Sequence, residues 1–129
     1  LFVLLQKYDK AKQEGILKIE MWGTGSPLRE FIYVDDLADA CIFLMNRYSG
    51  EDHINVGTGT EISILDLAKC ISEVVGFQGE IVCDTTKPDG KMRNAIDSSK
   101  LFAMGWKPKY TMKMGLEKMY KWYLSEKSN

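Results

Sequence analysis

The chain has 129 residues, of which 45% are hydrophobic and 27% are charged, proportions typical of one soluble globular domain with a sizeable core. Its 17 basic and 18 acidic residues leave a formal net charge of −1, so no basic field recruits nucleic acid or an anionic membrane. No apolar run has the length of a membrane span. Three widely spaced cysteines predict reduced thiols in a cytoplasmic protein, and a single histidine leaves no basis for a His-based metal site.

Hydrophobic periodicity predicts helices and strands that roughly alternate along the chain. The first helix begins in an apolar run and ends before a glycine, and Ser63 with Asp66 predicts the cap of a central helix that Gly76 closes. Such alternation predicts an α/β fold. The predicted helices span residues 1–14, 36–48, 63–76, 97–104 and 111–127, and the predicted strands span residues 16–21, 31–34, 53–56 and 80–84.

Two of these predictions concern burial. The strand at residues 31–34 reads as a buried apolar run, after which Asp35 and Asp36 fit the cap and the first turn of the next helix. That helix is amphipathic, and the periodicity predicts that its apolar face is buried. The residues of this predicted face are Leu37, Ala38, Cys41, Ile42, Met45 and Tyr48.

Two loops gather residues of special geometry and charge. The first, residues 22–29, contains Trp22, two glycines, a proline and Arg29; the second, residues 85–93, is polar and is broken by Pro88 and Gly90. These groups suit a nucleoside diphosphate sugar. Its diphosphate needs cations, its hydroxyls need a carboxylate acceptor, and its base needs an aromatic wall. Solvated surface loops explain the same residues equally well. Residues 57–59 form a lone Gly-x-Gly turn, and turns of this kind are more often structural than phosphate-binding. For a nucleoside diphosphate sugar, the two loops offer the cations Arg29, Lys87 and Arg93 and the acceptor Asp89.

The motifs of these loops resemble a known family. WGTG, REF and VDD are similar to the carboxyl-terminal half of the extended short-chain dehydrogenases/reductases that act on nucleotide sugars, and HINVGTG is similar to the same superfamily. The segment VVGFQGEIVCDTTKPDG, followed by Arg93 and LFAMGW, resembles the GDP-L-fucose synthases specifically. The resemblance covers nearly the whole chain. It implies that residues 1–129 are a substrate-binding domain.

The resemblance also implies a site. Trp22, Arg29 and Asp89 fall at substrate-contacting positions of these synthases, and Lys7 falls at a fourth. Lys87 and Arg93 complete the set of expected substrate-binding residues. The chain departs from the family where many relatives carry a further basic residue and it has Asn94. For Lys7, a solvated helix lysine remains an equal interpretation of the sequence.

Other features of these enzymes are missing from the chain. It has no G-x-G-x-x-G turn after a strand and no Tyr-x-x-x-Lys pair at the expected place. We therefore expect a piece of a longer enzyme whose NADP site and catalytic residues lie upstream of Leu1, with no catalytic, cofactor-binding or metal-binding residue in the chain itself. A strand such as residues 53–56 can belong to a sheet begun upstream.

The family implies that the whole enzyme epimerises GDP-4-keto-6-deoxy-D-mannose at C3 and C5 and then reduces the C4 ketone with NADPH. It is expected to be a cytoplasmic homodimer, and the chain alone is expected to be inactive. Two alternatives remain: the substrate domain of another nucleotide-sugar epimerase or dehydratase, and a non-catalytic α/β interaction module.

Overall fold

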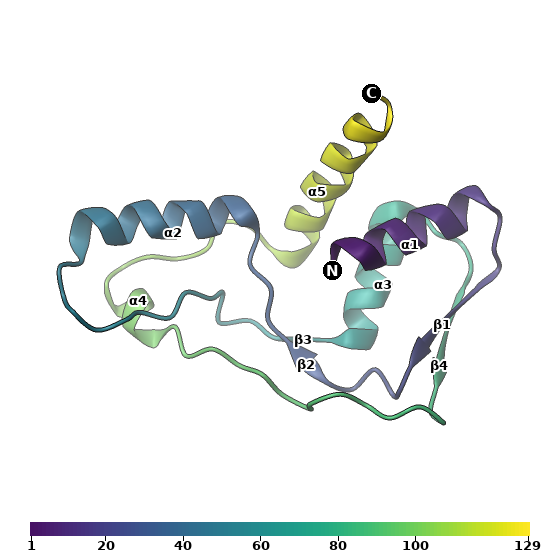
Figure 1. Ribbon diagram of the computed structural model, residues 1–129, viewed down its shortest axis with the longest axis horizontal. Helices are drawn as coiled ribbons and strands as arrows, with labels where there is room; N and C mark the ends of the chain where they lie inside the picture. The colour runs from purple at the N-terminus through teal and green to yellow at the C-terminus, as the bar shows by residue number, and fades with distance from the viewer.

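The computed structural model describes all residues 1–129 and alternates helices with short strands (Figure 1). This arrangement confirms the predicted α/β class. No helix combines the length and the apolar character needed to cross a membrane. The helices are α1 (Phe2–Gln13), α2 (Val34–Arg47), α3 (Ile64–Val75), α4 (Ser99–Ala103) and α5 (Met112–Lys127), and the strands are β1 (Lys18–Trp22), β2 (Leu28–Arg29), β3 (Ile62–Ser63) and β4 (Glu80–Asp84).

The strands form two separate pairs. β1 and β4 are parallel, with Lys18 opposite Glu80 and Trp22 opposite Asp84. β2 and β3 are antiparallel, with Arg29 opposite Ile62. In Figure 1 the second pair lies between a group formed by α1, α3, α5, β1 and β4 and a group formed by α2 and α4. We call these groups the large lobe and the small lobe.

The large lobe holds the main core, which is built around α3. The apolar stripe of α3 packs against α1 and α5, and its Ile71 is fully buried. The ends of α3 are as predicted: the Ser63 hydroxyl accepts the Asp66 N–H at 3.0 Å, and Gly76 takes the left-handed conformation with φ of +80°. The buried residues of this core are Leu5, Tyr8, Ala11, Ile19, Leu67, Ala68, Ile71, Val75, Phe77 and Leu116.

A buried carboxylate joins the two terminal helices. Asp9 on α1 is fully buried and accepts hydrogen bonds from the Tyr120 hydroxyl and the Lys127 ammonium of α5, each at 2.9 Å. Burial acts to raise the pKa of Asp9, but the bonds from Lys127 and Tyr120 outweigh it, so the pKa lies below its ordinary value. The ionised carboxylate therefore holds α1 against α5.

The small lobe has a much smaller core. Ala40, Leu101 and Trp106 are its buried apolar residues. The Trp106 indole donates a hydrogen bond to Asp39 of α2 at 3.0 Å. Trp106 is thus part of this core. Asp36, which is also buried, accepts backbone N–H bonds from residues 109 and 110 at 2.9 and 3.0 Å, and thereby ties α2 to the segment that leads into α5.

Two predicted strands are absent. Residues 31–33 are irregular, and Val34 already belongs to α2, whose N-cap is Tyr33; Asp35 and Asp36 are first-turn acids, so the predicted cap was wrong. Residues 53–57 are also irregular and form no backbone–backbone hydrogen bond. A strand exists only beside a hydrogen-bonding neighbour, and neither segment has one in this chain.

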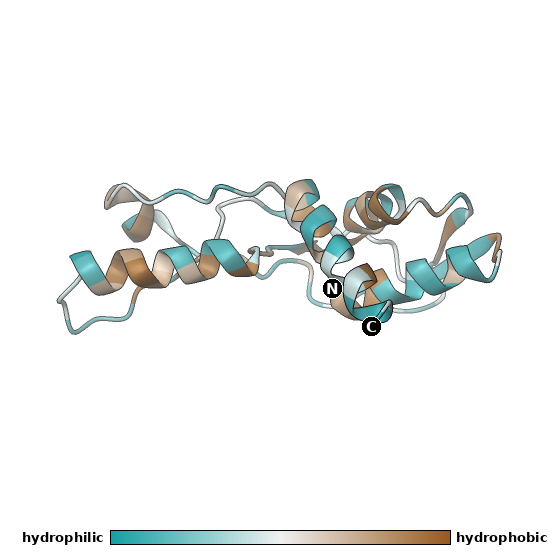
Figure 2. Cartoon of the chain, turned by 90° about the horizontal axis from the view of Figure 1, so that it is seen from above, coloured by the Kyte–Doolittle hydropathy of each residue, from teal (hydrophilic) through white to brown (hydrophobic).

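The predicted burial of α2 was also wrong. Along this helix, Ile42 is 60% exposed and Met45 is 81% exposed, and Cys41, which periodicity placed in the core, is exposed as well. Ala40 instead faces the small core, with Phe43 and Leu44 packed against that core. Figure 2 shows the apolar residues that α2 carries along its length. The helix is apolar on two faces, and this chain covers only one.

Candidate substrate site

The two predicted loops lie side by side because of the β1–β4 pairing. Trp22 ends β1 and Asp84 ends β4, and these two residues are opposite one another in a parallel pair. The loops that follow therefore leave from the same edge, as binding loops do at the carboxyl ends of parallel strands. The Gly23 N–H donates to the Asp84 carbonyl at 2.9 Å and continues the pairing into the first loop.

Asp89 joins the loops directly. Its Oδ1 accepts the backbone N–H of Thr24 at 2.8 Å, and its Oδ2 accepts the Thr24 hydroxyl at 2.7 Å. Gly23 makes this approach possible, because a Cβ on Gly23 would lie 2.2 Å from Asp89 Oδ1. Gly23 also has φ of +84°, a conformation that other residues rarely adopt.

Trp22 and Lys87 face each other across the same two loops. The Trp22 side chain is 70% exposed, although large aromatic side chains are usually at least partly covered. The Lys87 ammonium lies 5.3 Å from the centre of its ring, within the range of a cation–π contact. An exposed aromatic ring beside a cation is available to a ligand that carries both a flat base and negative charge.

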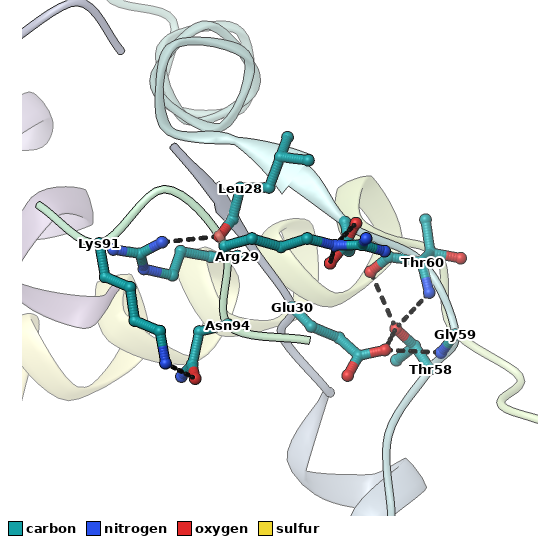
Figure 3. A network of polar contacts seen from close by, with 10 residues as sticks. Leu28, Arg29, Glu30, Thr58, Gly59, Thr60, Lys91 and Asn94 are labelled. Carbon is teal, nitrogen blue, oxygen red and sulfur yellow. Dashed lines mark hydrogen bonds and ion pairs between the residues drawn. The ribbon is translucent and has the colours of Figure 1, made fainter. Parts of the chain in front are cut away.

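Arg29 lies at the edge of this pair of loops. One guanidinium nitrogen donates to the Leu28 carbonyl at 2.7 Å, and another lies 3.5 Å from where a Gly90 side chain would begin. The guanidinium is thus close to the loop that carries Lys87 and Asp89. Figure 3 shows Arg29, the last residue of β2, and the following Glu30 extending toward different partners.

The other two predicted cations differ in their surroundings. Lys7 on α1 donates only to the Glu20 carbonyl, at 3.3 Å. Arg93 instead pairs with Glu61 through its Nε at 2.8 and 3.1 Å, and this pairing raises its pKa. Arg93 also bridges Leu28, so its segment extends the β2–β3 pair. The charge of Arg93 is therefore largely balanced within the chain.

Three of the predicted substrate-binding cations have no carboxylate partner. Lys7, Arg29 and Lys87 take part in none of the ion pairs in the structure. Unbalanced cations on two adjacent loops favour an anionic ligand such as a diphosphate.

The glycine turn at residues 57–59 has a different environment. Its Gly59 N–H donates to Glu30 Oε1 at 2.7 Å, and the Thr58 hydroxyl reaches the same oxygen at 3.4 Å (Figure 3). A carboxylate at this turn occupies the N–H that a phosphate would need and repels a phosphate as well. The contacts support the interpretation of a structural turn.

Comparisons with known proteins identify relatives of this chain. A model of the NAD dependent epimerase/dehydratase family matches residues 3–57. The chain is 54% identical over 121 residues to a putative GDP-L-fucose synthase 2 of Arabidopsis thaliana, and 52% identical over 126 residues to GDP-L-fucose synthase 1 of the same plant. These alignments cover 94% and 98% of this chain. The chain is related to the GDP-L-fucose synthases. The resemblance predicted from its motifs is thereby confirmed.

The chain spans only part of these GDP-L-fucose synthases, 37% and 39% of their lengths. The same holds for solved structures. A GDP-L-fucose synthetase from Naegleria fowleri matches 98% of this chain with a TM-score of 0.87 and 28% identity, over 40% of its own length. A GDP-mannoheptose C4 reductase from Campylobacter jejuni, solved with NADP bound, matches 95% of it with a TM-score of 0.83 and 38% identity, over 43% of its own length.

In this relative of the GDP-L-fucose synthases, the sequence did not predict a role in the site for Thr24, Glu30 or Glu61. Each acts as a partner: Thr24 for Asp89, Glu30 for the turn at residues 57–59, and Glu61 for Arg93. Their partners lie far along the chain, 65 residues in the case of Thr24. The one available signal was the place of Thr24 and Glu30 inside the WGTG and REF motifs.

Proposed function

We propose that this chain is the GDP-sugar-binding portion of a GDP-L-fucose synthase. The whole enzyme would convert GDP-4-keto-6-deoxy-D-mannose to GDP-L-fucose by epimerisation at C3 and C5 and NADPH-dependent reduction, as a cytoplasmic homodimer. One observation carries the proposal: an exposed tryptophan, a lysine over its ring and an unpaired arginine meet on two loops at the carboxyl ends of parallel strands.

Each residue has a role that follows from its chemistry. The Trp22 ring offers a flat apolar surface on which a guanine base can stack. Arg29 and Lys87, with Lys7 nearby on α1, supply the cations that a diphosphate needs. Asp89 holds the second loop against the first through its hydrogen bonds from Thr24. Arg93 shapes the second loop through its pairing with Glu61.

The residues of this chain do not form a site for NADP. Neither of its glycine turns follows the G-x-G-x-x-G pattern after a strand. The turn at residues 57–59 presents its Gly59 N–H to Glu30. NADPH supplies the hydride in this reaction class, and we propose that another part of the enzyme holds it, together with the catalytic residues. The chain alone would be inactive.

The surface of the small lobe supports the proposal of a longer enzyme. The exposed side of α2 has the apolar character of a covered face, with Val34 64% and Met45 81% exposed. A groove of about 540 Å³ between residues 31–34 and the start of α5 is lined by mostly apolar side chains, including Phe31 and Tyr110. Residues 53–57 form no backbone–backbone hydrogen bond, and a neighbouring strand would supply such bonds. A nucleotide-binding portion packed here would cover all three features.

The proposal is tested by replacing the two residues that it makes most important. In the enzyme that carries this chain, Trp22→Ala and Arg29→Ala should each weaken GDP-sugar binding by about 1.5–3 kcal/mol, because stacking and charge-assisted hydrogen bonds are lost. Calorimetric titration measures the affinity. Trp122→Ala and Arg47→Ala are matched controls, since both residues lie on helices away from the loops.

The same variants separate binding from packing. Unchanged affinity together with a lowered melting temperature would show that Trp22 and Arg29 are packing residues, and would refute the proposed site.

A further inference from the structure

The Asp89 carboxylate uses both of its oxygens on a residue of the opposite loop. The Thr24 N–H and hydroxyl donate to Oδ1 and Oδ2 at 2.8 and 2.7 Å. The Thr24 hydroxyl oxygen in turn accepts the Ser26 N–H at 3.1 Å, which closes the first loop upon itself. One carboxylate thus links two loops that are 65 residues apart in sequence.

The residues around this link leave space for the Asp89 carboxylate. Gly23 is buried and has no side chain, and Asp89 Oδ1 occupies the space that a Cβ would take. Pro88 has a fixed φ, which restricts the backbone that leads into Asp89. Both carboxylate oxygens are therefore committed to Thr24 by the backbone of each loop.

The link lies between the two groups assigned to the ligand. Trp22 immediately precedes the Gly23–Thr24 turn, and Lys87 lies two residues before Asp89. The Lys87 ammonium lies 5.3 Å from the Trp22 ring centre. If the loops separated, the ring and the ammonium would separate with them.

We propose that Asp89 is a positioning residue, which acts on a bound GDP-sugar through Thr24 by holding Trp22 and Lys87 at the spacing that the base and the diphosphate require. This inference rests on the proposed function. Because Asp89 and Thr24 are both exposed, their hydrogen bonds contribute little to global stability, and their loss is felt in ligand affinity.

Conservative and disruptive substitutions of Asp89 distinguish positioning from direct contact. In Asp89→Asn the amide oxygen can accept the Thr24 N–H and the amide nitrogen can donate to the Thr24 hydroxyl oxygen, so the link persists. We expect KM for the GDP-sugar to rise less than about threefold in Asp89→Asn and about tenfold or more in Asp89→Ala, with kcat affected less than KM in both.

Thr24→Val completes the test. It removes the hydroxyl and keeps the side-chain shape, so KM should rise by an amount between those of the two Asp89 variants. The double variant Asp89→Ala with Thr24→Val should raise KM by less than the two single effects combined, because both changes remove the hydroxyl bond between the loops, and Thr24→Val alone removes the acceptor of the Ser26 N–H. Asp97→Asn and Asp97→Ala are matched controls, since Asp97 bonds only the nearby Ser99 N–H, and neither should change KM.

Three results would overturn the inference. Asn as harmful as Ala, with a neutral Thr24→Val, would mean that the carboxylate contacts the ligand itself. Additive effects in the double variant would mean the same. A lowered melting temperature with unchanged KM would make Asp89 a turn stabiliser. Normal GDP affinity in Trp22→Ala and Arg29→Ala would instead remove the proposed function and leave the link as a structural feature.

Discussion

The two lobes of the molecule differ in how completely each is built. The large lobe buries ten apolar residues around α3, and its strands β1 and β4 pair over their whole length. The small lobe buries three apolar residues, and its extended segment at residues 53–57 has no backbone partner. The large lobe has its own core, whereas the small lobe leaves apolar side chains of α2 uncovered within this chain. The two candidate loops, residues 22–29 and 85–93, extend from the more complete lobe.

Truncation in the large core should have the largest effect. Ile71 is fully buried at the centre of α3, so Ile71→Ala should lower the free energy of unfolding by about 2–5 kcal/mol through lost burial and the cavity left behind. Urea denaturation measures it. Leu101→Ala in the small lobe should raise hydrogen exchange mainly within that lobe. Equal loss of protection in both lobes would show that they unfold as one unit.

The buried carboxylate of the large lobe should give a smaller, pH-dependent effect. Replacing Asp9 with Asn should cost about 1–3 kcal/mol at neutral pH, since Tyr120 and Lys127 lose a charged acceptor. Because its pKa is lowered in the folded protein, the contribution of Asp9 is present above about pH 4 and is lost as the pH falls through the lowered value.

The alkaline side has the opposite sign. Burial, and then the hydrogen bond to Asp9, raise the pKa of Tyr120 to about 12. The contribution of Tyr120 is therefore present below its ordinary pKa of 10.0 and is lost as the pH rises toward about 12. Denaturation curves across this range should show a steep loss in the wild type and a shallower one in Asp9→Asn. Tyr110→Phe, outside this cluster, should leave the slope unchanged.

The exposed face of α2 should give the smallest effect on folding. Ile42 is 60% exposed, so Ile42→Ser should change the stability of this chain by no more than about 0.5 kcal/mol. In the longer enzyme the same change should be destabilising, because the face would be covered there. Melting temperatures of the chain and of the longer enzyme provide the comparison, and Asn46→Ser is a polar control on the same helix. Equal tolerance in both would remove the proposed packing partner from this face.

Local patterns predicted most of the large lobe and less of the small one. The cap at Ser63, the left-handed Gly76 and the bounds of β4 follow from short-range rules and were confirmed. The face of α2 could not be chosen from periodicity, because the helix is apolar on two sides and only Ala40 and its neighbours have partners in this chain. Residues 53–57 have strand composition but no neighbour with which to pair.

For the site, sequence could find the loops but not their internal contacts. The glycines, Pro88 and the charged residues marked both loops, and the register of β1 with β4 brought them together. Three contacts of the site could not be predicted from the sequence. Nothing local indicates that Asp89 bonds Thr24, that Arg93 is paired with Glu61, or that Glu30 occupies the turn at residues 57–59, since each contact joins distant segments.

The central claim is that a GDP-sugar binds between the two loops at the carboxyl ends of β1 and β4. Hydrogen exchange of the enzyme that carries this chain, followed by mass spectrometry with and without GDP-mannose, tests it most directly. The account predicts slower exchange in peptides covering residues 22–29 and 85–93, and unchanged exchange in α2. Bound nucleotide that protects residues 57–62 and leaves both loops unchanged would contradict it.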